Sequence, residues 1–258
     1  MIRPAGTPII QELNDDLFVQ NNLKVYLKRE DLIHPMVSGN KWRKLKYNLI
    51  EARKSRKKRV LSFGGAYSNH IHALAYACSQ SKLGCTIYIR GEETLPLNPT
   101  LEDVRNFGAE VRYISREDYR QRDDEALLEI LLKEGNTVLI PEGGTNRLAI
   151  KGVEEMITEI NVDADLMITP VGTGGTLAGC AEGLTNKGSV LGIVVLKGAE
   201  GITNDILKLT KARNWQLNHD YHFGGYARYS SQLVNFINEF KKDHGIPLDP
   251  IYTGKMMY

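Results

Sequence analysis

Short apolar segments alternate with longer amphipathic segments along most of this chain. Apolar runs typical of buried strands are separated by stretches in which apolar residues recur every three or four positions, as on one face of a helix. The strand-like runs occupy residues 23–27, 60–63, 85–89, 111–114, 137–140, 166–169 and 190–195. Helical periodicity covers residues 42–52, 69–82, 98–107, 116–134, 147–160, 176–186 and 229–243. This alternation predicts an α/β protein with mostly parallel twisted sheets flanked by helices.

The composition is that of an ordinary globular protein. With 258 residues, of which 42% are hydrophobic, the chain can bury a large core in one or two domains. A net charge of +2 offers no concentrated basic surface, so nucleic acid is not an expected partner. The basic run at 53–59 falls where a helix should end, and cations there are stabilised by the helix dipole. Neither a signal peptide nor a membrane span is predicted, so we expect a cytoplasmic protein without a membrane partner.

The cysteines and histidines give no pattern for a disulfide framework or a metal site. Cys78, Cys85 and Cys180 are widely spaced and form no Cys-x-x-Cys motif. His70 and His72 have no carboxylate or third histidine close by in the sequence. We therefore predict that the protein holds no metal.

Three glycine-containing segments follow strand-like runs, where ligands bind in parallel sheets. Gly172–Thr176 precedes a helix of small residues. Its backbone amides and threonine hydroxyls are suited to binding a phosphate. The alternative is a glycine-rich turn that binds nothing. In the second segment, Ser68 and Asn69 either cap the next helix or bind a substrate carboxylate or a phenolic oxygen. Residues 141–146 are either a turn that lies against a flat ligand or a plain connection.

Lys41 opens a predicted helix directly after Ser38, Gly39 and Asn40. A lysine desolvated at the positive end of a helix is shifted toward the neutral amine, which is the form that attacks an aldehyde. Most lysines at helix starts are merely solvated, so the local sequence favours that alternative.

The order of the motifs changes this interpretation. Five motifs follow one another along the chain, at residues 28–31, 38–41, 68–69, 141–144 and 172–176. This order resembles the tryptophan-synthase-β-like (fold type II) enzymes that depend on pyridoxal 5′-phosphate (PLP). The closing Asp-Pro-Ile-Tyr-Thr-Gly-Lys segment, residues 249–255, resembles the branch of 1-aminocyclopropane-1-carboxylate (ACC) deaminase and D-cysteine desulfhydrase. The resemblance covers nearly the whole chain.

The resemblance implies a role for each matching residue. PLP would be the cofactor, and Lys41 would hold it as a Schiff base and move a proton, with Tyr252 and Ser68 as further catalytic residues. Other cofactor contacts would come from Asn69, Gly172, Thr173, Gly174, Gly175, Thr176 and Thr253. The small amino-acid substrate would contact Ser68, Asn69, His70 and Tyr226.

A two-domain architecture and a homodimer are also implied. Residues 1–45 and 150–258 would form a large PLP-binding domain, and residues 46–149 a small inserted α/β domain, with the substrate between the two. The family usually continues for several dozen residues beyond the Tyr-Thr-Gly-Lys motif, whereas this sequence stops at Tyr258. We therefore expect either a truncated sequence or a missing closing element.

Thr253 indicates which reaction the chain catalyses. In the resembling family, ACC deaminases carry Glu at this position, and a carboxylate there keeps the pyridine nitrogen protonated. A threonine hydroxyl leaves that nitrogen less basic, which suffices when a thiolate departs from the β-carbon. We therefore predict D-cysteine desulfhydrase-like elimination to pyruvate, ammonia and sulfide. The alternatives are an ACC deaminase, a non-catalytic PLP-binding homologue and a nucleotide-binding module; the last is disfavoured because no ATP or dinucleotide fingerprint is present.

Overall fold

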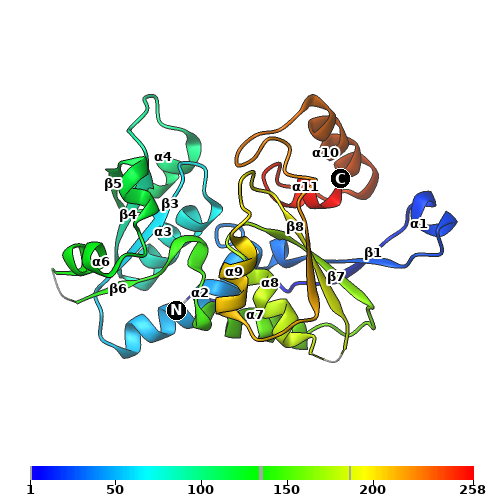
Figure 1. Ribbon diagram of the computed structural model, residues 1–258, viewed down its shortest axis with the longest axis horizontal. Helices are drawn as coiled ribbons and strands as arrows, with labels where there is room; N and C mark the ends of the chain where they lie inside the picture. Colours follow the sequence, from blue (N-terminus) through cyan, green and yellow to red (C-terminus); the bar gives the residue numbers. More distant parts are fainter. Residues whose placement is uncertain (1, 134–135, 186) are drawn as a thin grey trace. The chain divides into compact units, whose positions relative to one another are not determined.

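The computed structural model describes residues 2–133, 136–185 and 187–258 (Figure 1). Contacts divide the chain into two compact units, the first formed by residues 1–7 and 30–152 and the second by residues 8–29 and 153–258. This division groups residues 1–7 and 30–45 with the segment, residues 46–149, that was predicted to form an inserted domain. The functional division of the chain into PLP-binding and inserted domains stays a prediction.

The first unit is built on a parallel sheet with the strand order β5-β4-β3-β6 (Figure 1). Its strands are β3 (Arg59–Gly64), β4 (Gly84–Arg90), β5 (Glu110–Ile114) and β6 (Thr137–Leu139). Its helices are η1 (Glu30–Ile33), α2 (Asn40–Lys54), α3 (Asn69–Ser81), α4 (Pro99–Asn106), α5 (Arg116–Arg120), α6 (Glu125–Leu132) and η2 (Glu142–Gly144). Helix α7 (Arg147–Thr158) runs from the first unit into the second.

The core of the first unit lies between α3 and the two central strands. Helix α3 contacts β3 and β4, and apolar side chains from both strands and the helix are fully buried there. They include Val60, Ile71, Leu74, Ile87 and Ile89. Strands β3 and β4 are buried along almost their whole length, as expected for parallel strands that are covered on both faces.

The second unit contains a parallel sheet with the order β7-β8-β9 and a separate antiparallel pair of strands, β1 and β2 (Figure 1). Its strands are β1 (Ile10–Leu13), β2 (Val25–Lys28), β7 (Leu166–Val171), β8 (Ser189–Val194) and β9 (Trp215–Asn218). Its helices are α1 (Asp16–Gln20), α8 (Gly175–Gly183), α9 (Ile202–Leu209), α10 (Ser231–His244) and α11 (Thr253–Met257).

Helix α8 packs closely on this sheet because β8 carries a glycine at the contact. A Cβ on Gly192 would collide with the side chains of Leu177 on α8 and of Val171 and Leu217 on the neighbouring strands. Helix α8 therefore contacts both β7 and β8, and its N-terminus follows directly from the end of β7. This geometry places the glycine-rich segment at the carboxyl edge of the sheet.

The α/β class with parallel sheets flanked by helices is confirmed, and the structure corrects some of the predicted elements. The periodicity of residues 116–134 predicts one helix, but two short helices form, because Ser115 and Asp124 each cap a new start. The Ser115 hydroxyl accepts a hydrogen bond from the backbone N–H of Asp118 at 3.0 Å. The Asp124 carboxylate accepts one from the N–H of Ala126, also at 3.0 Å. Side-chain caps of this kind stop one helix and begin another.

Several short elements were not predicted, among them β1, β9, α1, α9 and α11. Each has between four and eight residues, which is too short for a clear hydrophobic period. No helix in the described part of the chain is long and apolar enough to cross a membrane. Within the same residues, no group of three metal-ligating side chains is found. The three cysteines are buried free thiols.

Candidate active site

Lys41 lies in the first turn of α2, as predicted. The turn is shaped by Gly39, which occupies the N-cap with a φ of 62°, a left-handed conformation that favours glycine. The Lys41 ammonium donates a hydrogen bond to the side-chain oxygen of Asn40 at 2.9 Å, and the lysine is half-buried. The residue is therefore held by its neighbour and is not fully exposed to solvent.

A second lysine, Lys44, lies one turn further along α2 and was missed by the sequence analysis. Its side chain is only 2% exposed, and its Nζ donates to the Thr145 hydroxyl at 2.8 Å. Burial, together with the charge of Lys41, holds the pKa of Lys44 well below its usual value. The three-residue spacing, which places both lysines on one helix face, was the available signal.

A buried ion pair fixes the first turns of α2. The Arg43 guanidinium donates to both carboxylate oxygens of Glu30, from Nε at 2.9 Å and from Nη2 at 3.1 Å. Helix α7 approaches the same place, because a Cβ on Gly152 would collide with the backbone carbonyl of Arg43. These contacts hold Arg43, two residues after Lys41, in place.

Ser68 and Asn69 lie at the start of α3, as predicted. The Ser68 hydroxyl oxygen accepts a hydrogen bond from the N–H of His70 at 3.2 Å, so it caps the helix. A hydroxyl that accepts one bond keeps its proton for another acceptor, so capping is compatible with a substrate contact. Asn69 is exposed at the first position of the helix.

His70, which was predicted to face the substrate carboxylate, is only 1% exposed. The Ser62 hydroxyl donates to the carbonyl of Ile140 at 2.6 Å, so it must accept the 2.8 Å bond from Nε2 of His70. Nδ1 is then the unprotonated nitrogen, and it has no hydrogen-bond partner among the described residues.

Burial is the largest cause that keeps the pKa of His70 well below its usual value, with smaller contributions from Lys41 and Lys44. A neutral, buried imidazole offers no positive charge to a carboxylate. The ring instead packs against the 142–144 turn, where a Cβ on Gly144 would lie 3.4 Å from Nδ1.

The glycine-rich segment at residues 172–176 has the geometry expected of an anion site. Gly174 is the N-cap of α8 and has a φ of 77°. The amides of the first turn of a helix have no intrahelical partners and point outward at its positive end, where they bind anions. Gly172 allows a close approach on the other side, since a Cβ there would lie 3.2 Å from the Tyr252 ring. The structure thus brings Tyr252 to the glycine-rich segment.

Thr253 is held by a local network around Asp249. The Asp249 carboxylate accepts hydrogen bonds from the N–H groups of Ile251 at 2.7 Å and Tyr252 at 2.8 Å. In return, the Thr253 hydroxyl oxygen accepts a bond from the N–H of Asp249 at 2.8 Å. The hydroxyl is therefore oriented, and its own proton can be donated to a further acceptor.

Tyr226 lies in a loop with unusual backbone geometry. Its neighbours Gly225 and Ala227 have φ values of 110° and 54°, and Tyr226 itself is half-buried. In the second unit the predicted residues therefore lie on the 172–176 segment, on this loop and at the start of α11. In the first unit, Lys41, Ser68 and Asn69 lie at the starts of α2 and α3.

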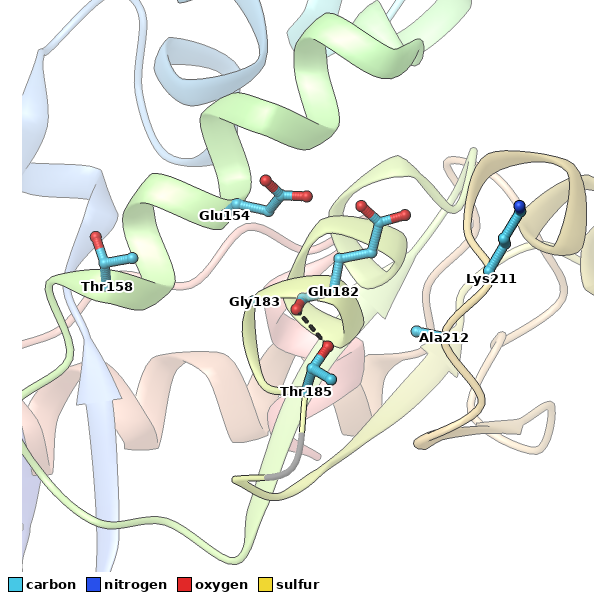
Figure 2. Close-up of a pocket in the computed structure, with 7 residues that line it drawn as sticks. All are labelled: Glu154, Thr158, Glu182, Gly183, Thr185, Lys211 and Ala212. Carbon is cyan, nitrogen blue, oxygen red and sulfur yellow. Dashed lines mark hydrogen bonds between the residues drawn. The ribbon is translucent and has the colours of Figure 1, made fainter.

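A pocket of about 590 Å³ in the second unit contains none of these residues (Figure 2). It is lined by Glu154, Thr158, Glu182, Gly183, Thr185, Lys211 and Ala212. Figure 2 shows that Glu182 lies at the end of α8, whereas the glycine-rich segment begins that helix. The Thr185 hydroxyl donates to the Glu182 carbonyl at 2.7 Å, which closes the helix. The pocket is therefore separate from the candidate site.

Comparison with known proteins shows the family to which this chain belongs. The model of the family described as pyridoxal-phosphate dependent enzyme matches residues 3–258. The chain belongs to this family of PLP-dependent enzymes.

Several relatives of the enzyme are similar over most of its length. A Thermotoga maritima protein, provisionally named 1-aminocyclopropane-1-carboxylate deaminase, is 31% identical and covers 98% of this chain and 87% of its own. The Arabidopsis thaliana protein named bifunctional D-cysteine desulfhydrase/1-aminocyclopropane-1-carboxylate deaminase, mitochondrial, is 30% identical. The aligned region covers 92% of this chain and 67% of the Arabidopsis protein. A crystal structure of an ACC deaminase homologue superposes with a TM-score of 0.83 at 27% identity, covering 99% and 85%.

The residues of the enzyme fit the chemistry of PLP. The cofactor carries an aldehyde, a phosphate and a pyridine nitrogen, which need an amine, an anion site and a hydrogen-bonding partner. Lys41 supplies an amine at a helix start, and α8 supplies outward-pointing amides at its N-terminus. Thr253 supplies an oriented hydroxyl. Each unit therefore carries residue types that the chemistry of PLP needs, and their roles in binding the cofactor stay predictions.

Proposed function

We propose that this enzyme breaks down a small amino acid by α,β-elimination, and that D-cysteine is its substrate. The products would be pyruvate, ammonia and sulfide. The observation that carries this proposal is the hydroxyl of Thr253, which the Asp249 N–H orients at the position that follows Tyr252. The name of the Arabidopsis relative, which includes D-cysteine desulfhydrase, supports the same chemistry.

Lys41 would hold the cofactor through its amine and then move the substrate's α-proton. The N–H groups and hydroxyls of Gly172–Thr176 would bind the phosphate, and Asn69 would bind the phenolic oxygen. When bound, PLP supplies an electron-withdrawing ring that accepts the electron pair left at Cα. Burial and the charge of Lys41 both lower the pKa of the neighbouring Lys44, so a second positive charge is disfavoured at this place.

Ser68 and Tyr226 would orient the substrate. The Ser68 hydroxyl, whose oxygen caps α3, would donate its proton to the substrate carboxylate. Tyr252 would lie against the ring or assist proton transfer, which its contact with Gly172 supports. His70 would act indirectly, through the 142–144 turn on which its ring packs.

The choice between sulfide release and ring opening follows from Thr253. A hydroxyl carries no negative charge, so it does not keep the pyridine nitrogen protonated as a carboxylate would. In the elimination, the α-proton leaves, the Cβ–S bond breaks with its electron pair on sulfur, and water hydrolyses the remaining enamine to pyruvate and ammonia. Opening a cyclopropane ring has no such leaving group and needs a stronger electron sink.

The test compares sulfide release from D-cysteine and L-cysteine with 2-oxobutanoate release from ACC, using purified enzyme with added PLP. We expect sulfide from D-cysteine to exceed product from ACC, and Lys41→Ala to abolish both. Lys46→Ala on the same helix serves as the matched control and should retain activity. Turnover of ACC in preference to D-cysteine would instead favour the deaminase named among the relatives.

The homodimer and the cytoplasmic location implied by the resemblance remain predictions. Light scattering of the purified protein tests the homodimer.

A further inference from the structure

Lys255 is the most completely buried cation in the described part of the second unit, and the proposed reaction gives it no role. Its side chain is 0% exposed. Its Nζ donates to the backbone carbonyls of Gly225 at 2.8 Å, His222 at 2.9 Å and Val195 at 3.4 Å. A buried charge is costly unless its partners are well arranged, so these contacts need an explanation.

The three carbonyl partners fit the protonated form of the lysine. An ammonium has three N–H donors and no lone pair, whereas a neutral amine would direct a lone pair at one of the carbonyl oxygens. Burial lowers the pKa of Lys255, and the charge of Asp249 opposes this shift. A cation surrounded by backbone carbonyl oxygens is also the arrangement by which proteins bind K⁺.

The carbonyls held by Lys255 belong to two segments that border the candidate site. Val195 follows β8, and its N–H donates to the carbonyl of Val171, the last residue before the glycine-rich segment. His222 and Gly225 belong to the loop of residues 222–228, which carries Tyr226. Lys255 itself lies on α11, two residues after Thr253.

The 222–228 loop has a backbone that needs such a constraint. Phe223 and Ala227 have φ values of 50° and 54°, although neither is a glycine, and Gly224 and Gly225 have φ values of 90° and 110°. Non-glycine residues adopt this region only when the surrounding structure fixes them, and such residues cluster at functional sites. Beyond the bonds to Lys255, the Phe223 ring packs edge-on against Tyr258 at 5.0 Å.

We propose that Lys255 is a positioning residue whose ammonium acts as a built-in monovalent cation and holds the 222–228 loop, and with it Tyr226, in place. The chain would then need no bound K⁺ for this purpose. The effect on substrate affinity rests on the proposed function, because it requires Tyr226 to contact the substrate. The effect on the loop itself is independent of any reaction.

Chemical rescue tests the proposal. Lys255→Ala removes three methylenes and the ammonium, a fragment that n-propylammonium replaces. Hydrogen exchange of the 222–228 loop, read by mass spectrometry, and the KM and kcat for D-cysteine are measured with propylammonium or with tetramethylammonium, which has no N–H donors. Lys255→Met, which keeps the stem and lacks the charge, is the second variant, and Lys208→Ala on the exposed surface is the control, since the Lys208 side chain is 76% exposed.

We expect both Lys255 variants to exchange the loop amides about tenfold faster or more, with Lys208→Ala unchanged. Propylammonium should restore protection of the loop amides in Lys255→Ala but not in Lys255→Met, and tetramethylammonium should restore it in neither. In both variants the KM for D-cysteine should rise about tenfold, with kcat nearly constant. The wild-type enzyme should give the same loop exchange in K⁺ as in tetramethylammonium at equal ionic strength.

Unchanged loop exchange in the variants, or K⁺-dependent loop exchange in the wild type, would overturn the proposal. If neither variant folds, the comparison of cations in the wild type still decides. Altered loop exchange in an enzyme that turns over neither D-cysteine nor ACC would leave Lys255 as the loop's cation and refute only the proposed function.

Discussion

Glu30→Gln should destabilise the first unit strongly, because it breaks a buried ion pair beside Lys41. The Glu30 and Arg43 side chains are 10% and 4% exposed and are joined by two hydrogen bonds of 2.9 and 3.1 Å. Removing one partner leaves the other charge buried and uncompensated, which costs about 3–5 kcal/mol. The bidentate geometry, with both oxygens engaged, places the expected loss within that range.

The matched control is Glu93→Gln, which breaks an exposed ion pair of the same type. The pair of Glu93 with Arg105 is short, at 2.6 Å, but its side chains are 42% and 41% exposed. Such pairs contribute about 0–1 kcal/mol, because water screens them and their side chains lose rotamer freedom. The two variants therefore change the same chemical group at two different depths.

Urea denaturation followed by circular dichroism measures the free energy of unfolding for both variants, with the slope against urea compared to ensure that the same transition is observed. We expect the Glu30→Gln loss to exceed the Glu93→Gln loss by at least about 2 kcal/mol. Losses that agree within about 0.5 kcal/mol would refute the argument that burial of this pair fixes the start of α2.

Three further predictions concern the reaction and the residues around it. Thr253→Glu should lower sulfide release from D-cysteine relative to 2-oxobutanoate release from ACC, since a carboxylate would protonate the pyridine nitrogen; an unchanged ratio of the two rates would contradict this. Ser62→Ala should cost about 1–3 kcal/mol in urea denaturation because it leaves the Nε2–H of His70 buried without an acceptor, and a neutral effect would mean that the ring is not held as described. Folding lowers the pKa of Lys44, so below the unfolded pKa of about 10.4 the unfolded chain keeps a proton on this lysine that the folded chain loses. The free energy of unfolding of the wild type should therefore rise with pH in this range, relative to that of Lys44→Met. Parallel pH profiles of the two proteins would argue against a lowered pKa.

The sequence predicted the sheets well because parallel strands are buried on both faces. Strands such as β3 and β4 appear as continuous apolar runs, and these need no knowledge of tertiary contacts. The single helix predicted at 116–134 was wrong, because the polar cap at Asp124 lies inside a pattern that is otherwise helical. A single polar residue hardly changes the hydrophobic period of a long segment, but its side chain caps the backbone and starts a new helix.

Only residues that lie in recognisable sequence motifs were predicted for the candidate site. Lysines count as surface residues in any hydrophobic pattern, so the burial of Lys44 and Lys255 could not be predicted from periodicity. The state of His70 depends on Ser62, which lies within β3, and on Ile140, which directly follows β6. Such contacts between distant parts of the sequence leave no local signal.

The most direct test of the central claim asks which amine holds the cofactor. The purified enzyme, saturated with PLP, is reduced with borohydride and digested, and the peptides are analysed by mass spectrometry. The account predicts a phosphopyridoxyl group on Lys41 and on no other lysine. The group on Lys44 or Lys255, or no stable modification, would contradict it.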